Sequence, residues 1–402
     1  SVGDYALQKV LYDAEGIFGY YPHPPNFTTN SRTNMNRCEW MSKLPDTVPL
    51  HQLNIPGTHA STTWFFNNET HLTSPYNSKK ANNLPPASLY QCQTSSIIHS
   101  LNAGIRFFDL SFSIDTTGKN LVFQHGNALL SETATVETVM FGFYAWLEQH
   151  PSEALFISLK YGPYPHEPPL TPQSSIDKLI YTLLTSRPAR RFIYQPKTLP
   201  YSLGDCRGKI ILLRRFDLLL PHFDLPGIHL SPRHYPPCHS KQPFSLTYGG
   251  RYDKHQRQLH ISDWHDLSSS LSGQPPTSYI KEKLLVVDSH LELASKGYSG
   301  EESGGGKQQG TSHDDGPEVV NPDDGELWIT FTSGESNLDG VTPEILALGS
   351  EDTKDSEGHR FGVNKGLCKL LRTRYRGKRL GVIVVDFWDG EHGDDLVGAI
   401  LG

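Results

Sequence analysis

The feature that most constrains the fold is a series of eight short apolar runs separated by longer mixed segments. Several runs are apolar on both alternating faces, which is typical of parallel strands covered by helices. The runs are residues 50–55, 105–112, 121–126, 154–162, 209–216, 258–264, 327–334 and 379–388. Helical patterns fill several gaps, at residues 136–150, 174–186, 278–294 and 362–375. Strands that alternate with helices predict an α/β fold, an irregular (β/α)8 TIM barrel.

A doubly wound open sheet is the structural alternative for the same pattern. Neither G-x-G-x-x-G nor G-x-x-x-x-G-K-[ST] accompanies the runs, so we favour the barrel. We expect an N-terminal extension at residues 1–39 and a single barrel at residues 40–402. Residues 161–172 are rich in proline and predict a loop. Residues 297–326 are rich in glycine, serine and acids, and predict a mobile surface insertion.

Composition excludes some classes of function. The formal net charge is −7, from 36 Lys and Arg against 43 Asp and Glu, so no basic field is available to hold nucleic acid. No apolar run approaches the ~20 residues that span a bilayer, and no signal peptide is visible. The five cysteines show no zinc-site spacing and fit either a reduced cytosol or one or two disulfides. The compartment stays open, with a secreted protein favoured; a monomer is expected.

Polar residues at the ends of the predicted strands are the candidates for chemistry, because barrel active sites collect at the carboxyl ends of strands. They are His59, Asp109, His125, Lys160, Arg215, Asp263, His265 and Asp386. Two converging histidines suit a concerted pair, one accepting a proton and the other donating one. Asp386 is suited to orient one ring, while Lys160 and Arg215 are suited to hold an anion. Such a site splits a phosphodiester.

Seven motifs in chain order resemble those of the phosphatidylinositol-specific phospholipase C X-domain family, of the small bacterial and fungal type. They are LPDTVPLHQLNIPGTHAST, GIRFFDLSFS, FQHG, HPSEALFISLK, GDCRGKIILLRRF, WITFTSG and GVIVVDFW, which cover residues from about 40 to 390. The resemblance implies an irregular (β/α)8 barrel. It also implies cleavage of phosphatidylinositol to diacylglycerol and a cyclic inositol phosphate, without a cofactor.

The resemblance also assigns roles to the candidate residues. His59 matches the general base that takes the proton of the inositol 2-hydroxyl, and Asp386 matches the carboxylate that pairs with it. His125 matches the general acid that protonates the diacylglycerol oxygen, and Asp109 the carboxylate beside that acid. The expected head-group contacts are Lys160, Arg215 and Asp263, with His265 where the family often has a stacking tyrosine.

Two departures from the family pattern bear on activity. Ala60 stands where the family reads Asp after the histidine, and Ser111 stands where it reads Arg. In the family pattern the Asp and the Arg carry opposite charges, and leaving either one alone in a low-dielectric site would cost several kcal/mol. The loss of both together therefore avoids an unpaired buried charge. Neither Ala60 nor Ser111 can coordinate a divalent ion well, so we expect a metal-independent site.

Two hypotheses follow from these departures. In the first, the chain is a working phosphodiesterase in which Lys160, Arg215 or another cation such as Arg106 compensates at the phosphate, on phosphatidylinositol or a different substrate. In the second, the barrel has lost strong catalysis and binds inositol- or sugar-phosphate head groups.

Peripheral membrane contact is a separate hypothesis. Residues 62–66 (TTWFF) and 216–227 place aromatic and leucine side chains after two predicted strands, where they could enter a bilayer. The alternative is that they pack against the barrel rim.

Overall fold

The computed structural model describes residues 2–19, 37–73, 85–115, 117–131, 133–162, 172–219, 224–248, 257–297, 326–390 and 395–402. Its strands are β1 Ile55–Thr58, β2 Phe107–Ile114, β3 Leu121–His125, β4 Ala128–Leu129, β5 Leu155–Tyr161, β6 Ile210–Arg215, β7 Ile228–His229, β8 Phe244–Tyr248, β9 Arg257–Ser262, β10 Leu327–Phe331 and β11 Val382–Val385. The predicted insertion and the centre of the predicted proline-rich loop lie outside the described residues.

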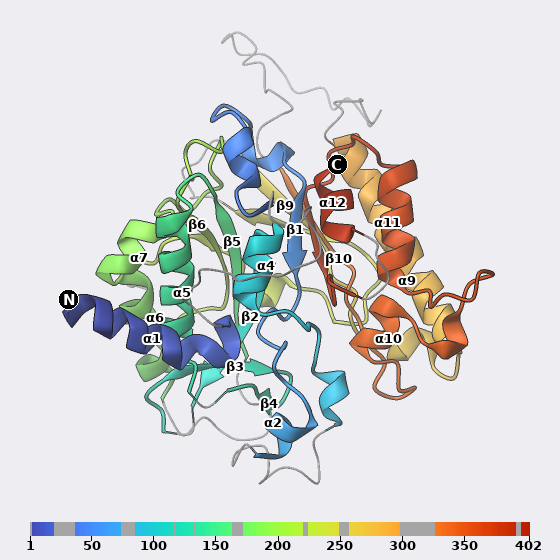
Figure 1. Cartoon of the computed structure of the whole chain (residues 1–402), viewed down its shortest axis with the longest axis horizontal. Coiled ribbons are helices and arrows are strands. Elements are labelled where there is room, and N and C mark those ends of the chain that lie inside the picture. Colours follow the sequence, from blue (N-terminus) through green and yellow to red (C-terminus); the bar gives the residue numbers. More distant parts are fainter. Residues whose placement is uncertain are drawn as a thin grey trace, which may run out of the picture.

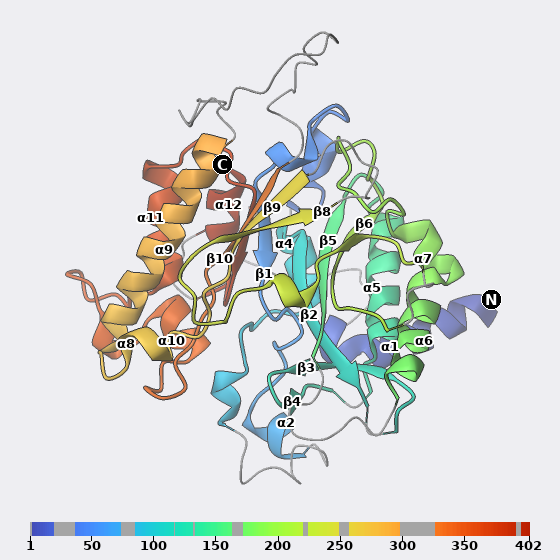
Figure 2. The same cartoon turned by 180° about the vertical axis from the view of Figure 1, so that it is seen from behind.

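The strands form one 11-stranded sheet in the order β7-β6-β5-β2-β1-β11-β10-β9-β8, with β3 and β4 attached beside β2. Every neighbour from β7 to β9 runs parallel, and β8 joins β9 antiparallel. The sheet curves into a nearly closed barrel, with helices outside it on both sides (Figures 1 and 2). The predicted α/β class and irregular TIM barrel are confirmed.

The helices of this cover are α1 Val2–Phe18, α2 Asn68–Thr73, α4 Ile97–Ala103, α5 Val136–Gln149, α6 Gln173–Thr185, α7 Arg187–Phe192, α8 Ser268–Leu271, α9 Pro276–Gly297, α10 Pro343–Leu348, α11 Val363–Thr373 and α12 Leu396–Leu401. The four helical segments predicted from sequence correspond to α5, α6, α9 and α11. Helices α5, α6 and α7 lie to one side of the strands and α9, α11 and α12 to the other (Figure 1).

Two predicted barrel strands were wrong. Residues 121–126 contain β3, which pairs antiparallel with β2 as a hairpin instead of joining the parallel series. The turn is too short for a parallel crossover, which needs a dozen or more residues; Asp115 N–H bonds Asn120 O across it at 2.9 Å. Residues 50–52 form a 3-10 turn after Pro49, and β1 begins only at Ile55. The eighth parallel strand is the short β7, which sequence periodicity missed.

Alternation along each strand divides the core into two layers. Phe107 on β2 packs with Phe156, Ile211 and Val384 inside the barrel. Phe108, the next residue, packs outward against the helix layer, where its ring lies 5.2 Å from that of Phe143 on α5. Both faces of the strands are therefore buried, which is why their sequences read as continuous apolar runs.

The N-terminal residues 2–18 form helix α1, which packs across α5. The rings of Phe18 and Phe143 meet edge to face at 5.3 Å, and Gly142 of α5 gives α1 room, since a Cβ there would lie 2.7 Å from Phe18. The indole Nε1 of Trp64 donates to Ile17 O at 2.8 Å, which ties α1 to the loop after β1. This part of the expected extension is thus an ordered helix against the barrel cover.

Two further features bear on the chain's setting. All five cysteines lie in the described part of the chain and are free thiols, so the alternative of one or two disulfides is not realised. Among the described helices, none combines the length and the apolar character that a bilayer crossing requires.

Candidate active site

All eight predicted site residues line one pocket of about 400 Å³. They belong to seven different strands or follow them directly, and all but Asp109, the third residue of β2, lie at or just after a strand's carboxyl end, so folding brings together positions spread over most of the chain. They are His59, Asp109, His125, Lys160, Arg215, Asp263, His265 and Asp386. The barrel geometry explains this meeting, because parallel strands all end at the same face.

His59 and Asp386 form a hydrogen-bonded pair. Thr58 of β1 lies opposite Val385 of β11, so the residue after each strand leaves the sheet at the same level. The His59 Nδ1–H donates to Asp386 Oδ1 at 3.0 Å, and the Asp386 side chain is buried. Burial lowers the pKa of His59, but the charge of Asp386 and its hydrogen bond outweigh burial and raise that pKa above 6.5.

His125 faces His59 from the end of the β3 hairpin. The two ring centroids lie 5.6 Å apart. The His125 Nδ1–H donates to Tyr90 O at 2.7 Å, so its orienting partner is a neutral backbone carbonyl and not a carboxylate. Burial lowers the pKa of His125 to about 3, and the charges of His59 and Lys160 act in the same direction. In the free protein His125 is therefore the neutral ring of the two.

Arg215 bridges two carboxylates on the floor of the pocket. Its Nη1 lies 3.2 Å from Asp109 Oδ1, and its Nη2 lies 3.4 Å from Asp263 Oδ2. Asp109 Oδ1 also accepts from Ser158 Oγ at 2.7 Å. Asp109 was expected beside the general acid; the structure bonds it to Arg215 and Ser158, and bonds His125 to Tyr90.

Aromatic and imidazole groups complete this network. The ring of Tyr235 lies 4.7 Å from the Arg215 guanidinium carbon. His265 Nδ1 lies 3.3 Å from Asp263 Oδ1, so Asp263 has a partner on each side. Burial raises the pKa of Asp263, but the His265 hydrogen bond and the charges of His265 and Arg215 outweigh it, and the pKa falls below its usual range. Arg215 is thus a cation largely committed to protein carboxylates.

Lys160 is a cation without such a commitment. It lies beside Ser111 in the parallel register of β2 and β5, and no ion pair to it is formed within the described ranges. The charge of Arg215, followed by desolvation, lowers the pKa of the Lys160 ammonium. A pocket ammonium that forms no ion pair with any described residue is suited to receive an anionic ligand.

Sequence reasoning missed several residues of the site. Ser158 lies two positions before Lys160 on β5, and the period of two along a strand could have placed it on the same face. Glu335 follows β10 and lines the pocket, where burial raises its carboxyl pKa; the strand-end rule could have found it. Tyr90 and Tyr235 lie in segments without periodicity, and nothing in the sequence signals them.

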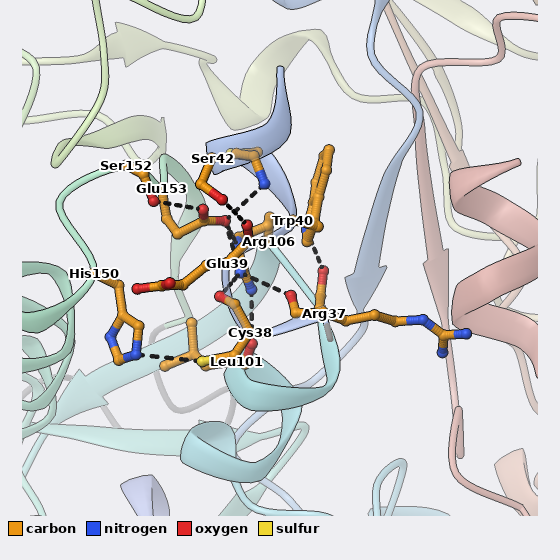
Figure 3. Close-up of polar contacts among 12 residues, drawn as sticks. Arg37, Cys38, Glu39, Trp40, Ser42, Leu101, Arg106, His150, Ser152 and Glu153 are labelled. Atoms are coloured by element: carbon orange, nitrogen blue, oxygen red, sulfur yellow. Dashed lines mark hydrogen bonds and ion pairs between the residues drawn. The ribbon is translucent and has the colours of Figure 1, made fainter. Parts of the chain in front are cut away.

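Arg106, proposed from sequence as an alternative cation for the phosphate, does not line the pocket. It precedes β2, at the amino end of that strand, and is 0 % exposed; Cys38, Leu101 and Glu153 surround it (Figure 3). Its Nη2 lies 2.8 Å from Glu153 Oε2, and its Nη1 donates to Leu101 O at 2.7 Å. The compensating role expected of Arg106 is therefore wrong; the residue closes the bottom of the barrel.

One group of potential metal ligands lies at the site. His59, Cys92 and Asp386 present ligand atoms within 4.8 Å of one another. His59 and Asp386 are already bonded to each other, and burial with the charge of Asp386 raises the pKa of the Cys92 thiol well above its ordinary value. The donor set therefore fits a hydrogen-bonded pair better than a prepared metal cage, which needs a thiolate.

The segments after β1 and β6 carry exposed apolar side chains. Phe65 is 49 % exposed and Leu219 is 67 % exposed. Trp64 is less available because its indole is bonded to α1. The two expected membrane segments thus divide: Trp64 is tied to α1, whereas Phe65 and Leu219 face outward. Residues 220–223 of the second segment lie outside the described residues.

Comparison with known proteins finds relatives of the kind that the sequence motifs resemble. No protein-family model matches the chain. The 1-phosphatidylinositol phosphodiesterase of Listeria monocytogenes is 30 % identical over 195 residues, which covers 47 % of this chain and 52 % of that protein. The human PI-PLC X domain-containing protein 1 is 31 % identical over 136 residues, 30 % of this chain and 41 % of that protein. The chain spans about half the length or less of the curated relatives it matches.

Solved structures agree over most of the chain. A double mutant of the phosphatidylinositol-specific phospholipase C from S. aureus superposes with a TM-score of 0.60 at 17 % identity, covering 92 % of this chain and 97 % of that one. The Listeria monocytogenes enzyme gives a TM-score of 0.54 at 22 % identity, covering 91 % and 97 %. The fold is therefore that of a phospholipase C barrel. The sequence matches agree with this fold: the chain is similar to PI-PLC and PI-PLC X domain-containing proteins, as its motifs predicted.

Proposed function

We propose that this chain is a metal-independent phosphodiesterase that cleaves phosphatidylinositol, or a closely related phosphodiester, to diacylglycerol and a cyclic inositol phosphate. The observation that carries the proposal is the arrangement of the two histidines. Each ring uses its Nδ1 on a fixed acceptor, Asp386 for His59 and Tyr90 O for His125. Both Nε2 atoms are therefore left for chemistry, on rings whose centroids are 5.6 Å apart.

The proposed reaction is an internal displacement at phosphorus. His59 Nε2 takes the proton of the inositol 2-hydroxyl, and that oxygen attacks phosphorus. The bond from phosphorus to the diacylglycerol oxygen breaks, and His125 Nε2 donates its proton to the departing oxygen. His125 must first gain a proton, and the negative charge of the bound phosphodiester supplies the field that raises its pKa.

Lys160 is the proposed counter-charge for the phosphate. The family's arginine is replaced here by Ser111, a short side chain, and Lys160 lies beside it on the next strand. Arg215 is less suited because Asp109 and Asp263 already neutralise it. Asp263 and His265, with Arg215, are left to contact the hydroxyls of the head group.

The alternative is a barrel that binds inositol- or sugar-phosphate head groups without cleaving them. The loss of both family charges at Ala60 and Ser111 favours it, because a missing oxyanion donor can cost ~10²- to 10³-fold in rate. A lipid substrate also requires contact with a bilayer, for which the exposed Phe65 and Leu219 are the proposed anchors.

Phosphorus NMR of the protein mixed with phosphatidylinositol in detergent separates these functions. The protein is tested with EDTA and with calcium, beside His59→Ala and His125→Ala. A cyclic inositol phosphate signal that survives EDTA and disappears in both variants supports the proposed enzyme. No product under any condition, with inositol phosphate still bound, would instead establish the binding protein. Product that requires calcium would contradict metal independence.

A further inference from the structure

The backbone is in an unfavourable conformation immediately after both members of the His59–Asp386 pair. Ala60 has φ 41° and Phe387 has φ 45°, and no other non-glycine residue in the described ranges has a positive φ. Residues other than glycine, asparagine and aspartate rarely occupy this left-handed region. Such strain persists only where the surrounding structure enforces it, and it collects at functional sites.

Gln93, in the loop before α4, is one of the groups that enforce this conformation. Its side chain is 1 % exposed, and its Nε2 donates to His59 O at 2.8 Å and to Val385 O at 3.0 Å. One amide group therefore spans the ends of β1 and β11, directly beneath the pair. The neighbouring Cys92 O accepts from Phe387 N–H at 2.9 Å, which extends the link to the residue after Asp386.

Asn364, in the first turn of α11, makes the matching contacts on the other strand. Its Nδ2 donates to Asp386 O at 2.8 Å and to Phe387 O at 3.1 Å. The two amides thus approach the pair from different elements of the barrel cover. Together they bind the main-chain carbonyls of both His59 and Asp386.

The same two amides are incompletely satisfied. Gln93 Oε1 and Asn364 Oδ1 are buried and have no hydrogen-bond partner in the described part of the molecule. A buried polar atom without a partner is destabilising, so an amide is a poor choice at either position if stability alone is served. Each amide instead donates two hydrogen bonds to main-chain carbonyls at the strand ends.

We propose that Gln93 and Asn364 are positioning residues that hold the His59–Asp386 pair at its reactive separation and angle. This inference rests on the proposed function for its catalytic consequence, whereas the geometry it describes exists in the free protein. Neither residue is expected to touch substrate. A displacement of about 1 Å at a reacting group can lower a rate by ~10²-fold, so these contacts are expected to act on kcat.

The test replaces each donor and reads the pair directly. Gln93→Met and Asn364→Leu remove the amides while keeping comparable bulk. Asn54→Leu is the matched control: Asn54 Nδ2 donates to Lys378 O at 2.9 Å and its Oδ1 accepts from Leu380 N at 2.7 Å, joining the same two strands at their opposite ends. The readouts are the His59 pKa from histidine NMR, kcat and KM from phosphorus NMR, and thermal stability.

We expect Gln93→Met and Asn364→Leu to lower kcat ~10- to 100-fold with KM changed less than about twofold, and to lower the His59 pKa. Asn54→Leu should lower thermal stability and leave kcat and the His59 pKa unchanged. If Gln93→Met does not fold, Gln93→Asn keeps the amide but withdraws it by one methylene and is read the same way. An unchanged His59 pKa in the folded variants would overturn the proposal. An inactive wild-type protein whose His59 pKa still falls in the variants would uphold the positioning role and reject the proposed function.

Discussion

Ser111 and Lys160 occupy matching positions on the neighbouring parallel strands β2 and β5, so the residue that lacks the family's positive charge lies beside a pocket cation. A long side chain on the adjacent strand can reach the region above a short one. The charge needed to stabilise a phosphate can therefore come from one strand further along the barrel. Lys160 is therefore placed to supply the positive charge that is missing at Ser111.

Replacing Lys160 tests whether its ammonium stabilises the bound phosphate. Lys160→Met is expected to lower kcat/KM by ~10²- to 10³-fold, because it removes the uncommitted positive charge from the pocket. Ser111→Arg in the same background should restore part of the loss by returning a cation to the neighbouring strand. Lys209→Met, which alters a lysine at the opposite end of β6, is the control and should have little effect. Wild-type kinetics in Lys160→Met would show that another group carries the phosphate.

The protonation of His59 is expected to depend on Asp386. Since Asp386 favours the charged ring, the pKa of His59 is raised, and its neutral, basic form increases as the pH rises through that raised pKa. Asp386→Asn removes that charge, so burial should dominate and bring the pKa below 6.5. Titration of the His59 Cε1–H NMR signal measures this. Asp389→Asn is the control, since Asp389 accepts from Thr94 Oγ1 at 2.6 Å and is not bonded to His59; an equal shift there would contradict a specific pair.

The Arg106–Glu153 pair is expected to support stability and not catalysis. Arg106→Met leaves Glu153 buried without its cation, and should lower the free energy of unfolding by about 3–5 kcal/mol. Activity per folded molecule should not change, because the pair lies at the end of the barrel away from the pocket. The double variant Arg106→Met/Glu153→Leu should recover much of the lost free energy of unfolding. Denaturant unfolding of both variants measures this. The exposed pair Arg191–Glu148 provides the comparison, and Arg191→Met should cost no more than about 1 kcal/mol.

Phe65 is expected to contribute to bilayer binding. Phe65→Ser removes an exposed aromatic side chain from the segment after β1 and should weaken binding to phosphatidylinositol vesicles about tenfold, since burying such a side chain is worth roughly 1.5–3 kcal/mol. Hydrolysis of a soluble inositol phosphodiester should not change. Leu285→Ser, at a 54 % exposed leucine on α9, is the control for general loss of apolar surface. Equal losses on vesicles and on the soluble ester would argue against membrane contact.

Most of the site was predictable because strand ends are visible in the sequence. A polar residue that closes an apolar run, such as Lys160 or Arg215, is placed at the mouth by the barrel alone. Arg106 shows the limit of that rule: it begins a run instead of closing it, and so lies at the other end. Gln93 and Asn364 were not predictable, because their contacts depend on how a loop and a helix pack over the strands.

The fold was predictable to a similar degree. Its prediction failed where strand pairing depends on neighbouring segments and not on the apolar run itself. The count of eight parallel strands was right, but residues 121–126 are not among them and β7 is. An apolar run shows that a strand is buried but does not show which neighbour it pairs with. The short turn after Asp115 carried that information, and periodicity alone does not include it.

The place of His125 on a hairpin has a consequence for how proteins of this kind can diverge. The proposed base, His59, follows β1 and is bonded to Asp386 after β11, so it depends on two neighbouring strands of the parallel series. The proposed acid, His125, ends β3, a strand attached beside β2 by antiparallel pairing, and its ring is bonded to Tyr90 O. Under the proposed function, changes in the β3 hairpin can alter which leaving group is protonated while the parallel strands stay intact, so the two halves of the proposed reaction can diverge separately.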